Sequence, residues 1–152
     1  MKLAEALLLR ADLQKKLASL KARIGRFTRV QEGDAPAEDP NALISEALIV
    51  TRELHRLIAQ IHRTNAKSQL PQGAPMLDTL IQRDALVEQH KVLMASLTQA
   101  RQSEDRYSRR EIRWVLHVSV PVLQQQADEL AAQLRQLNVR IQEANWQVEL
   151  LE

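Results

Sequence analysis

Apolar residues near the end of the chain recur at alternating intervals of four and three residues. They are Leu123, Ala127, Leu130, Leu134, Leu137, Ile141, Ala144, Val148 and Leu151. This heptad spacing places all of them on one stripe of an α-helix, and such a stripe must pack against partner helices. The pattern therefore predicts a helix over residues 121–151 within a helical bundle.

Three earlier stretches predict further helices, over about residues 2–29, 40–67 and 76–103. The helix at 40–67 is unusual because it carries two neighbouring stripes of mainly apolar residues. The first stripe is Leu43, Ala47, Val50, Leu54, Leu57 and Ile61, and the second is Ile44, Leu48, Thr51, His55, Ile58, His62 and Asn65. Two stripes on one helix indicate two partner surfaces.

Residues 111–118 break the helical rhythm. Apolar side chains recur at every second position from Ile112 to Val118, which is typical of a β-strand. Residues 27–31 are the expected partner strand, and pairing of the exposed edges with another subunit is the alternative. Short loops make consecutive helices antiparallel neighbours. The sequence therefore predicts an all-α fold: an antiparallel four-helix bundle of coiled-coil hairpins with a small two-stranded β element, as a single domain spanning residues 1–152.

The composition narrows the possible chemistry. The 152 residues include three glycines, four aromatic residues and no cysteine. The lack of cysteine excludes disulfides, thiolate catalysis and sulfur-ligated metals. No glycine-rich phosphate loop, dinucleotide fingerprint or nucleophile elbow is present, so we expect neither an enzyme nor a bound cofactor.

The net charge of +2 is unevenly distributed. Residues 1–31 carry eight basic and two acidic side chains, whereas residues 121–152 carry two basic and five acidic ones. This asymmetry favours attraction between the first and last helices over binding to nucleic acid. No apolar run reaches the length of a membrane span and no cleavable signal peptide is evident, so we expect a cytoplasmic protein without stable membrane insertion.

Several short blocks resemble the septicolysin-like family of small, mostly uncharacterised helical bacterial proteins. The blocks are residues 2–13, 30–34, 61–65, 105–108 and 140–146. The resemblance implies a bacterial source and, as an alternative function, a membrane-active, pore-forming toxin. It implies no catalytic residues.

Two histidines are candidate metal ligands. In an antiparallel hairpin that turns near Gln72, His55 and His90 lie at about the same height, with Glu88 nearby in sequence. Imidazole and carboxylate groups bind Zn²⁺ or a similar divalent ion. A metal-binding bundle is therefore a second alternative, set against the simpler interpretation that both histidines bond to neighbouring residues.

A group of charged residues interrupts the apolar stripes at one end of the predicted bundle. It consists of Arg10, Asp12, His62, Arg83 and Asp84. Because an unpaired buried charge is costly, we expect these side chains to form a mixed polar core layer that fixes helix register. A ligand site is the alternative interpretation.

The apolar surface exceeds what one four-helix core needs, since the helix at 40–67 carries two stripes and Leu7, Leu8 and Leu9 widen the first helix. Trp114 and Trp146 are candidate interface anchors. We therefore expect a homo-oligomer, and the sequence favours a non-enzymatic, self-associating interaction or structural protein.

Overall fold

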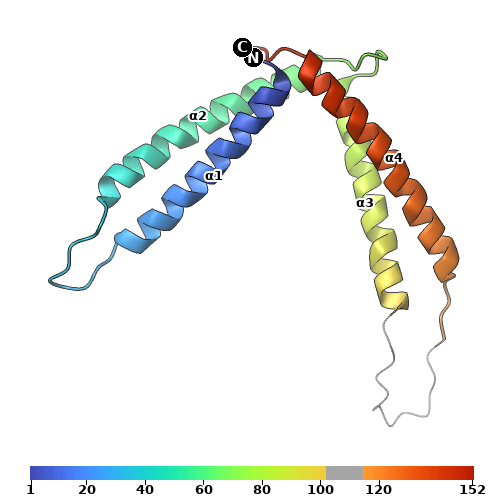
Figure 1. Ribbon diagram of the computed structural model, residues 1–152, viewed down its shortest axis with the longest axis horizontal. Helices are drawn as coiled ribbons and strands as arrows, with labels where there is room; N and C mark the ends of the chain where they lie inside the picture. Colours follow the sequence, from blue (N-terminus) through green and yellow to red (C-terminus); the bar gives the residue numbers. More distant parts are fainter. Residues whose placement is uncertain (102–114) are drawn as a thin grey trace, which may run out of the picture. The chain divides into compact units, whose positions relative to one another are not determined.

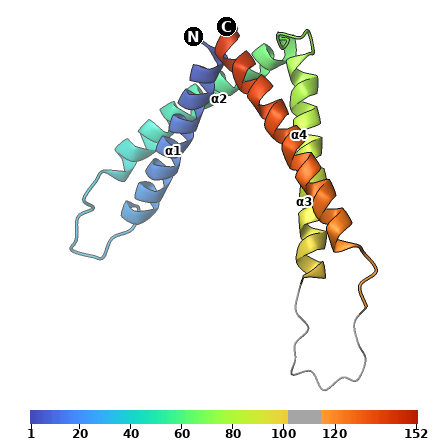
Figure 2. The same cartoon turned by 45° about the vertical axis from the view of Figure 1, so that its right-hand side comes forward.

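Four helices account for most of the fold in the computed structural model, which describes residues 1–101 and 115–152. They are α1 (Leu3–Phe27), α2 (Pro40–Lys67), α3 (Met76–Ala100) and α4 (Val120–Gln147). Both views show α1 running antiparallel beside α2, and α3 beside α4 (Figures 1 and 2). The all-α, four-helix prediction is confirmed. Within the described residues, no helix is both long and apolar enough to cross a bilayer.

The chain forms two compact units. The first contains residues 1–75 together with 142–152, and the second contains residues 76–141. Helix α4 therefore contributes its last turns to the first unit and its remaining length to the second. The expectation of a single domain stays a prediction.

The first stripe of α2 forms the core of the first unit. All six of its predicted residues, from Leu43 to Ile61, are buried. They face α1, where Leu3, Ala6, Leu13 and Leu20 are buried at heptad spacing. The 3-4 periodicity thus identified the seam between α1 and α2.

The connection between α1 and α2 follows from local chemistry. Gly33 has a φ of 93°, a left-handed conformation that favours glycine. Asp39 caps α2 because its carboxylate accepts a hydrogen bond from the Asn41 N–H at 2.9 Å, and Pro40 occupies the first turn. The start of α2 therefore lies where the sequence predicts it.

The two ends of the chain pair with each other. The Leu3 N–H donates to the Val148 carbonyl, and the Leu150 N–H donates to the Met1 carbonyl, each at 2.9 Å. Beside them, the Lys2 ammonium lies 2.6 Å from a Glu149 carboxylate oxygen. Helix α4 ends at Gln147 rather than near 151, because the backbone of the tail bonds to the N-terminal residues instead of continuing the helix.

The seam of the second unit is less completely buried. On α4, Ala127, Leu137 and Ile141 are buried, and the other heptad positions between them are half-buried. On α3, Leu97 is buried near the C-terminal end, whereas Leu86 and Leu93 are half-buried. This agrees with the weaker apolar pattern of that helix.

The predicted two-stranded β element is wrong for the described residues. Residues 115–118 form no strand, and the rest of the predicted strand, including Trp114, lies outside the described part of the chain. The β pairing in the described residues consists of two isolated bridges, Lys2 with Glu149 and Gln69 with Pro75.

The segment expected to pair with that strand begins at the end of a helix instead. Phe27 is the last residue of α1, and the Thr28 N–H and hydroxyl both donate to the Ile24 carbonyl. These bonds continue the helical pattern by one residue. Hydrogen-bonding groups at the start of the 27–31 segment are therefore occupied and cannot form a strand edge.

Candidate interaction surface

The α1–α2 hairpin has one flank that carries acidic residues. Lys16 Nζ lies 2.8 Å from Glu46, and the Arg23 guanidinium pairs with Glu38, with Nε 2.8 Å from Oε2. The Arg23–Glu38 hydrogen bond lowers the pKa of Glu38 and raises that of Arg23. The Lys16–Glu46 pair joins the two antiparallel helices along this flank, and the Arg23–Glu38 pair joins α1 to the loop just before α2.

Every carboxylate within α1 and α2 lies on this same flank. At about 100° per residue, Glu5 and Asp12 lie on the Lys16 side of the buried Leu13. On α2, Glu53 is seven residues from Glu46 and therefore shares its side of the helix. The other flank of the hairpin consequently carries no acid from either helix.

The opposite flank, which we call the acid-free face, is apolar and basic. It consists of Ile44, Leu48, His55 and His62 of α2 with Arg10 and Lys21 of α1. It contains the second stripe of α2, whose Leu48 side chain is 58% exposed. Four of the seven residues of that stripe are exposed and Thr51, Ile58 and Asn65 are half-buried. Packing against α1 thus leaves much of the second partner surface predicted for α2 uncovered.

Two polar groups within the acid-free face already have partners. The Thr51 hydroxyl donates to the Ala47 carbonyl at 2.7 Å, and the His55 Nδ1–H donates to the Thr51 carbonyl at 2.8 Å. Because burying a bonded polar group costs far less than burying a free one, these groups do not oppose covering the face.

Arg10 stands on the acid-free face without a partner for its inner nitrogen. Arg10 and Lys16 lie three residues before and after Leu13, and therefore on opposite sides of it. The Arg10 Nε is buried and has no hydrogen-bond partner in the described part of the chain. A buried N–H without an acceptor destabilises the fold, so an acidic group placed here would be stabilising.

The variant Arg10→Met tests whether the Arg10 Nε lacks an acidic partner within the chain. At submicromolar concentration, where association is weakest, the free energy of unfolding should stay constant or rise by up to about 1 kcal/mol. The reason is that the variant removes an unpaired N–H and keeps an apolar side chain of similar length. Urea unfolding followed by circular dichroism measures this. A loss of about 3–5 kcal/mol would instead reveal an acidic partner within the chain.

The other residues of the predicted polar core layer are distributed over both units. Asp12 lies on the acidic flank and His62 on the acid-free face, and both are exposed. In the second unit, Arg83 pairs with its neighbour Asp84, with Nη2 2.7 Å from Oδ1. This ion pair joins residues that are adjacent in the sequence, and a complete layer stays a prediction.

The two candidate metal ligands lie in different units. His55 is exposed on α2, and its hydrogen bond to Thr51 leaves Nε2 as the nitrogen free to bind an ion. His90 is half-buried on α3. Within residues 1–101 and 115–152, no group of three or more His, Asp and Glu side chains is arranged to hold a metal. Metal binding by this pair stays a prediction.

Of the two tryptophans predicted to anchor an interface, Trp146 lies within the described residues. Trp114 lies outside the described residues. Trp146 is 55% exposed in the last turn of α4. Its neighbour Asn145 is buried instead, which the heptad pattern did not indicate.

Thr64 has a role that was not predicted from the sequence. This residue is fully buried in α2, where its hydroxyl donates to the Gln60 carbonyl at 2.8 Å and accepts from the Leu151 N–H at 3.0 Å. The signal was present, because Thr64 follows Ile61 by three residues and so extends the first stripe of α2 by one position.

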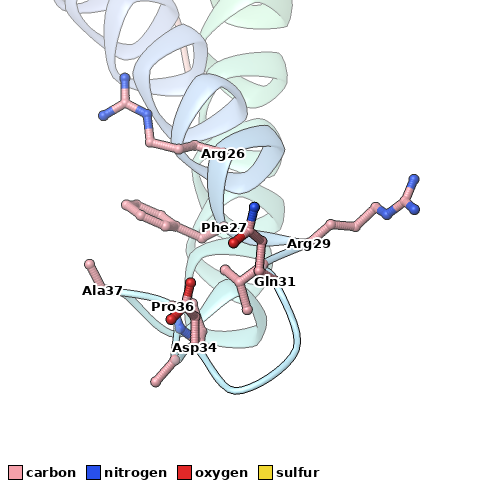
Figure 3. A pocket seen from close by; sticks show the side chains of 9 residues that line it. Arg26, Phe27, Arg29, Gln31, Asp34, Pro36 and Ala37 are labelled. Atoms are coloured by element: carbon pink, nitrogen blue, oxygen red, sulfur yellow. The ribbon is translucent and has the colours of Figure 1, made fainter.

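A shallow hollow of about 530 Å³ lies beside the α1–α2 loop. Figure 3 shows Phe27, Gln31, Asp34 and Pro36 around it, with the side chains of Arg26 and Arg29 extending to opposite sides. Because the two guanidinium groups diverge, they do not form a joint anion site. The acid-free face is therefore the stronger candidate for binding.

Comparison with known proteins assigns the chain to a family. A family model described as a family of unknown function (DUF6847) matches residues 10–150. The chain is also similar to a solved structure described as a functionally unknown conserved protein from Corynebacterium diphtheriae. The two sequences are 36% identical, the match covers 99% of each chain, and the TM-score is 0.88. No curated protein matches the chain.

The resemblance to the septicolysin-like family is wrong. The model that matches residues 10–150 describes a different family, and neither comparison that found a match points to a cytolysin. The blocks that suggested the resemblance are short, so they discriminate poorly between helical families. The toxin function implied by that resemblance has no support.

Proposed function

We propose that this chain, which belongs to the family of unknown function DUF6847, is a non-enzymatic helical protein that self-associates as an interaction or structural component. The observation that carries the proposal is the exposed second stripe of α2. Ile44 and Leu48 are 41% and 58% exposed on a helix whose other stripe is fully buried. A helix with two apolar stripes and one partner has an unfilled partner surface.

The hairpin architecture supports the same conclusion. A pair of helices buries one stripe from each member, whereas a four-helix bundle gives each helix two neighbours. Apolar side chains are also exposed in the second unit, on α3, where Ile81 is 59% and Val92 65% exposed. Docking a further hairpin onto each unit would cover both surfaces.

The size of the particle in solution tests the proposal. Light scattering behind a sizing column, at tens of micromolar protein, should give a whole-number multiple of the 17.4 kDa chain mass. A dimer is expected, because two-fold symmetry is the commonest closed arrangement. A mass of one chain over the whole accessible concentration range would refute self-association.

Two further expectations from the sequence belong to this proposal. One is a cytoplasmic location, and the other is the lack of a nucleic-acid partner. The acidic flank supports the lack of a nucleic-acid partner. Lys16 and Arg23 are already paired with carboxylates there, whereas binding to nucleic acid requires basic side chains that neutralise phosphates.

A further inference from the structure

We propose that the acid-free face of one copy binds the exposed face of α3 in a second copy. This inference rests on the proposed self-association and names its two surfaces. The exposed α3 face consists of Leu77, Ile81, Asp84, Ala85, Glu88 and Val92. Its members lie within an arc of about 100° on the helix. It is therefore an apolar stripe that contains two carboxylates.

Charge makes the two surfaces complementary. The acid-free face presents Arg10 and Lys21 and no carboxylate, whereas Asp84 and Glu88 are the charged residues within the α3 stripe. Arg83 and Lys91 contact these acids at 2.7 and 2.6 Å, but the side chains of Asp84 and Glu88 are 68% and 70% exposed. Such exposed pairs contribute little, so the carboxylates remain available to a second copy.

The dimensions of the two surfaces also agree. From Ile44 to His62 the face on α2 extends about 27 Å, and from Leu77 to Val92 the stripe on α3 extends about 22 Å, at 1.5 Å per residue. Each stripe runs for four to five turns. One helix can therefore lie along the other over about four turns, with Ile44 and Leu48 supplying the apolar part of the α2 surface.

The same chemistry disfavours contact between two acid-free faces. Such a contact would bring Arg10 and Lys21 of both copies together without a carboxylate. Contact with α3 instead places the carboxylates of Asp84 and Glu88 opposite these basic side chains. Because every copy carries both surfaces, two copies can form two identical contacts, which closes a dimer with two-fold symmetry.

Single variants test each surface separately. Leu48→Glu and Ile81→Glu each place a carboxylate in the middle of one apolar stripe, and each should weaken dimerisation at least 100-fold by analytical ultracentrifugation. Matched controls are the adjacent exposed positions Ile49→Glu and Gln82→Glu, which point away from the two surfaces and should leave the dissociation constant unchanged. Because both target positions are exposed, the melting temperature of the monomer should be retained.

Mixing the two variants distinguishes this pairing from other dimers. In a heterodimer of Leu48→Glu and Ile81→Glu, both substitutions fall in one contact and the second contact is intact. The mixture should therefore associate more tightly than either variant alone. If the wild type dimerises but Ile81→Glu does so equally well, or the mixture stays monomeric, this pairing is wrong and self-association stands. A wild type that remains monomeric overturns both proposals.

Discussion

Replacing Ile61 with alanine should lower the free energy of unfolding by about 2–5 kcal/mol. Ile61 is only 2% exposed and lies on the buried stripe of α2. Alanine would remove three carbon atoms from a packed seam and leave a cavity that the surrounding helices can close only in part. Urea unfolding followed by circular dichroism at 222 nm measures the loss.

Ile49→Ala provides the matched control on the same helix. Ile49 is 56% exposed and lies outside both stripes of α2, so its truncation should cost less than about 0.5 kcal/mol. Equal losses of unfolding free energy for the two variants would mean that α2 packs against α1 through a different face. The comparison therefore tests the register of the hairpin independently of any association.

Periodicity made the helices predictable. Burial of one stripe is the dominant requirement on an amphipathic helix, and α2 satisfies it at every predicted position from Leu43 to Ile61. The cap of this helix was equally predictable, because Asp39 followed by Pro40 is a local signal that needs no tertiary contact. The uncovered second stripe of α2 follows from the same pattern.

Features that depend on pairing between distant segments were not predictable. The alternation at 111–118 indicated a strand, but a strand requires a partner, and the proposed partner is bonded to the end of α1 through Ile24. The heptad pattern likewise continues past Gln147, although the tail pairs there with residues at the start of the chain. Backbone hydrogen bonds between chain ends leave no periodic signal.

The candidate sites also combine features of a single helix, which were predictable, with features that depend on several helices, which were not. The sequence indicated that Arg10 interrupts an apolar stripe, but a polar layer needs positions from several helices, and Asp12 lies on the opposite flank from Arg10. Two residues along a helix rotate the side chain by about 200°, which separates these neighbours. The asymmetric placement of Glu5, Glu46 and Glu53 became evident only once the pairing of α1 with α2 was known.

Replacing Thr64 with valine should detach the C-terminal tail and cost about 1–3 kcal/mol. The Thr64 hydroxyl is fully buried and accepts the Leu151 N–H at 3.0 Å, and valine keeps the shape but offers no acceptor. Amide hydrogen exchange should show faster exchange at Leu151 and Leu150, together with a lower melting temperature. Thr64→Ser retains the hydroxyl and should keep the tail protected, with a smaller loss from its missing methyl group. If valine protected the Leu151 amide as well as threonine does, the hydroxyl would not be what holds the tail.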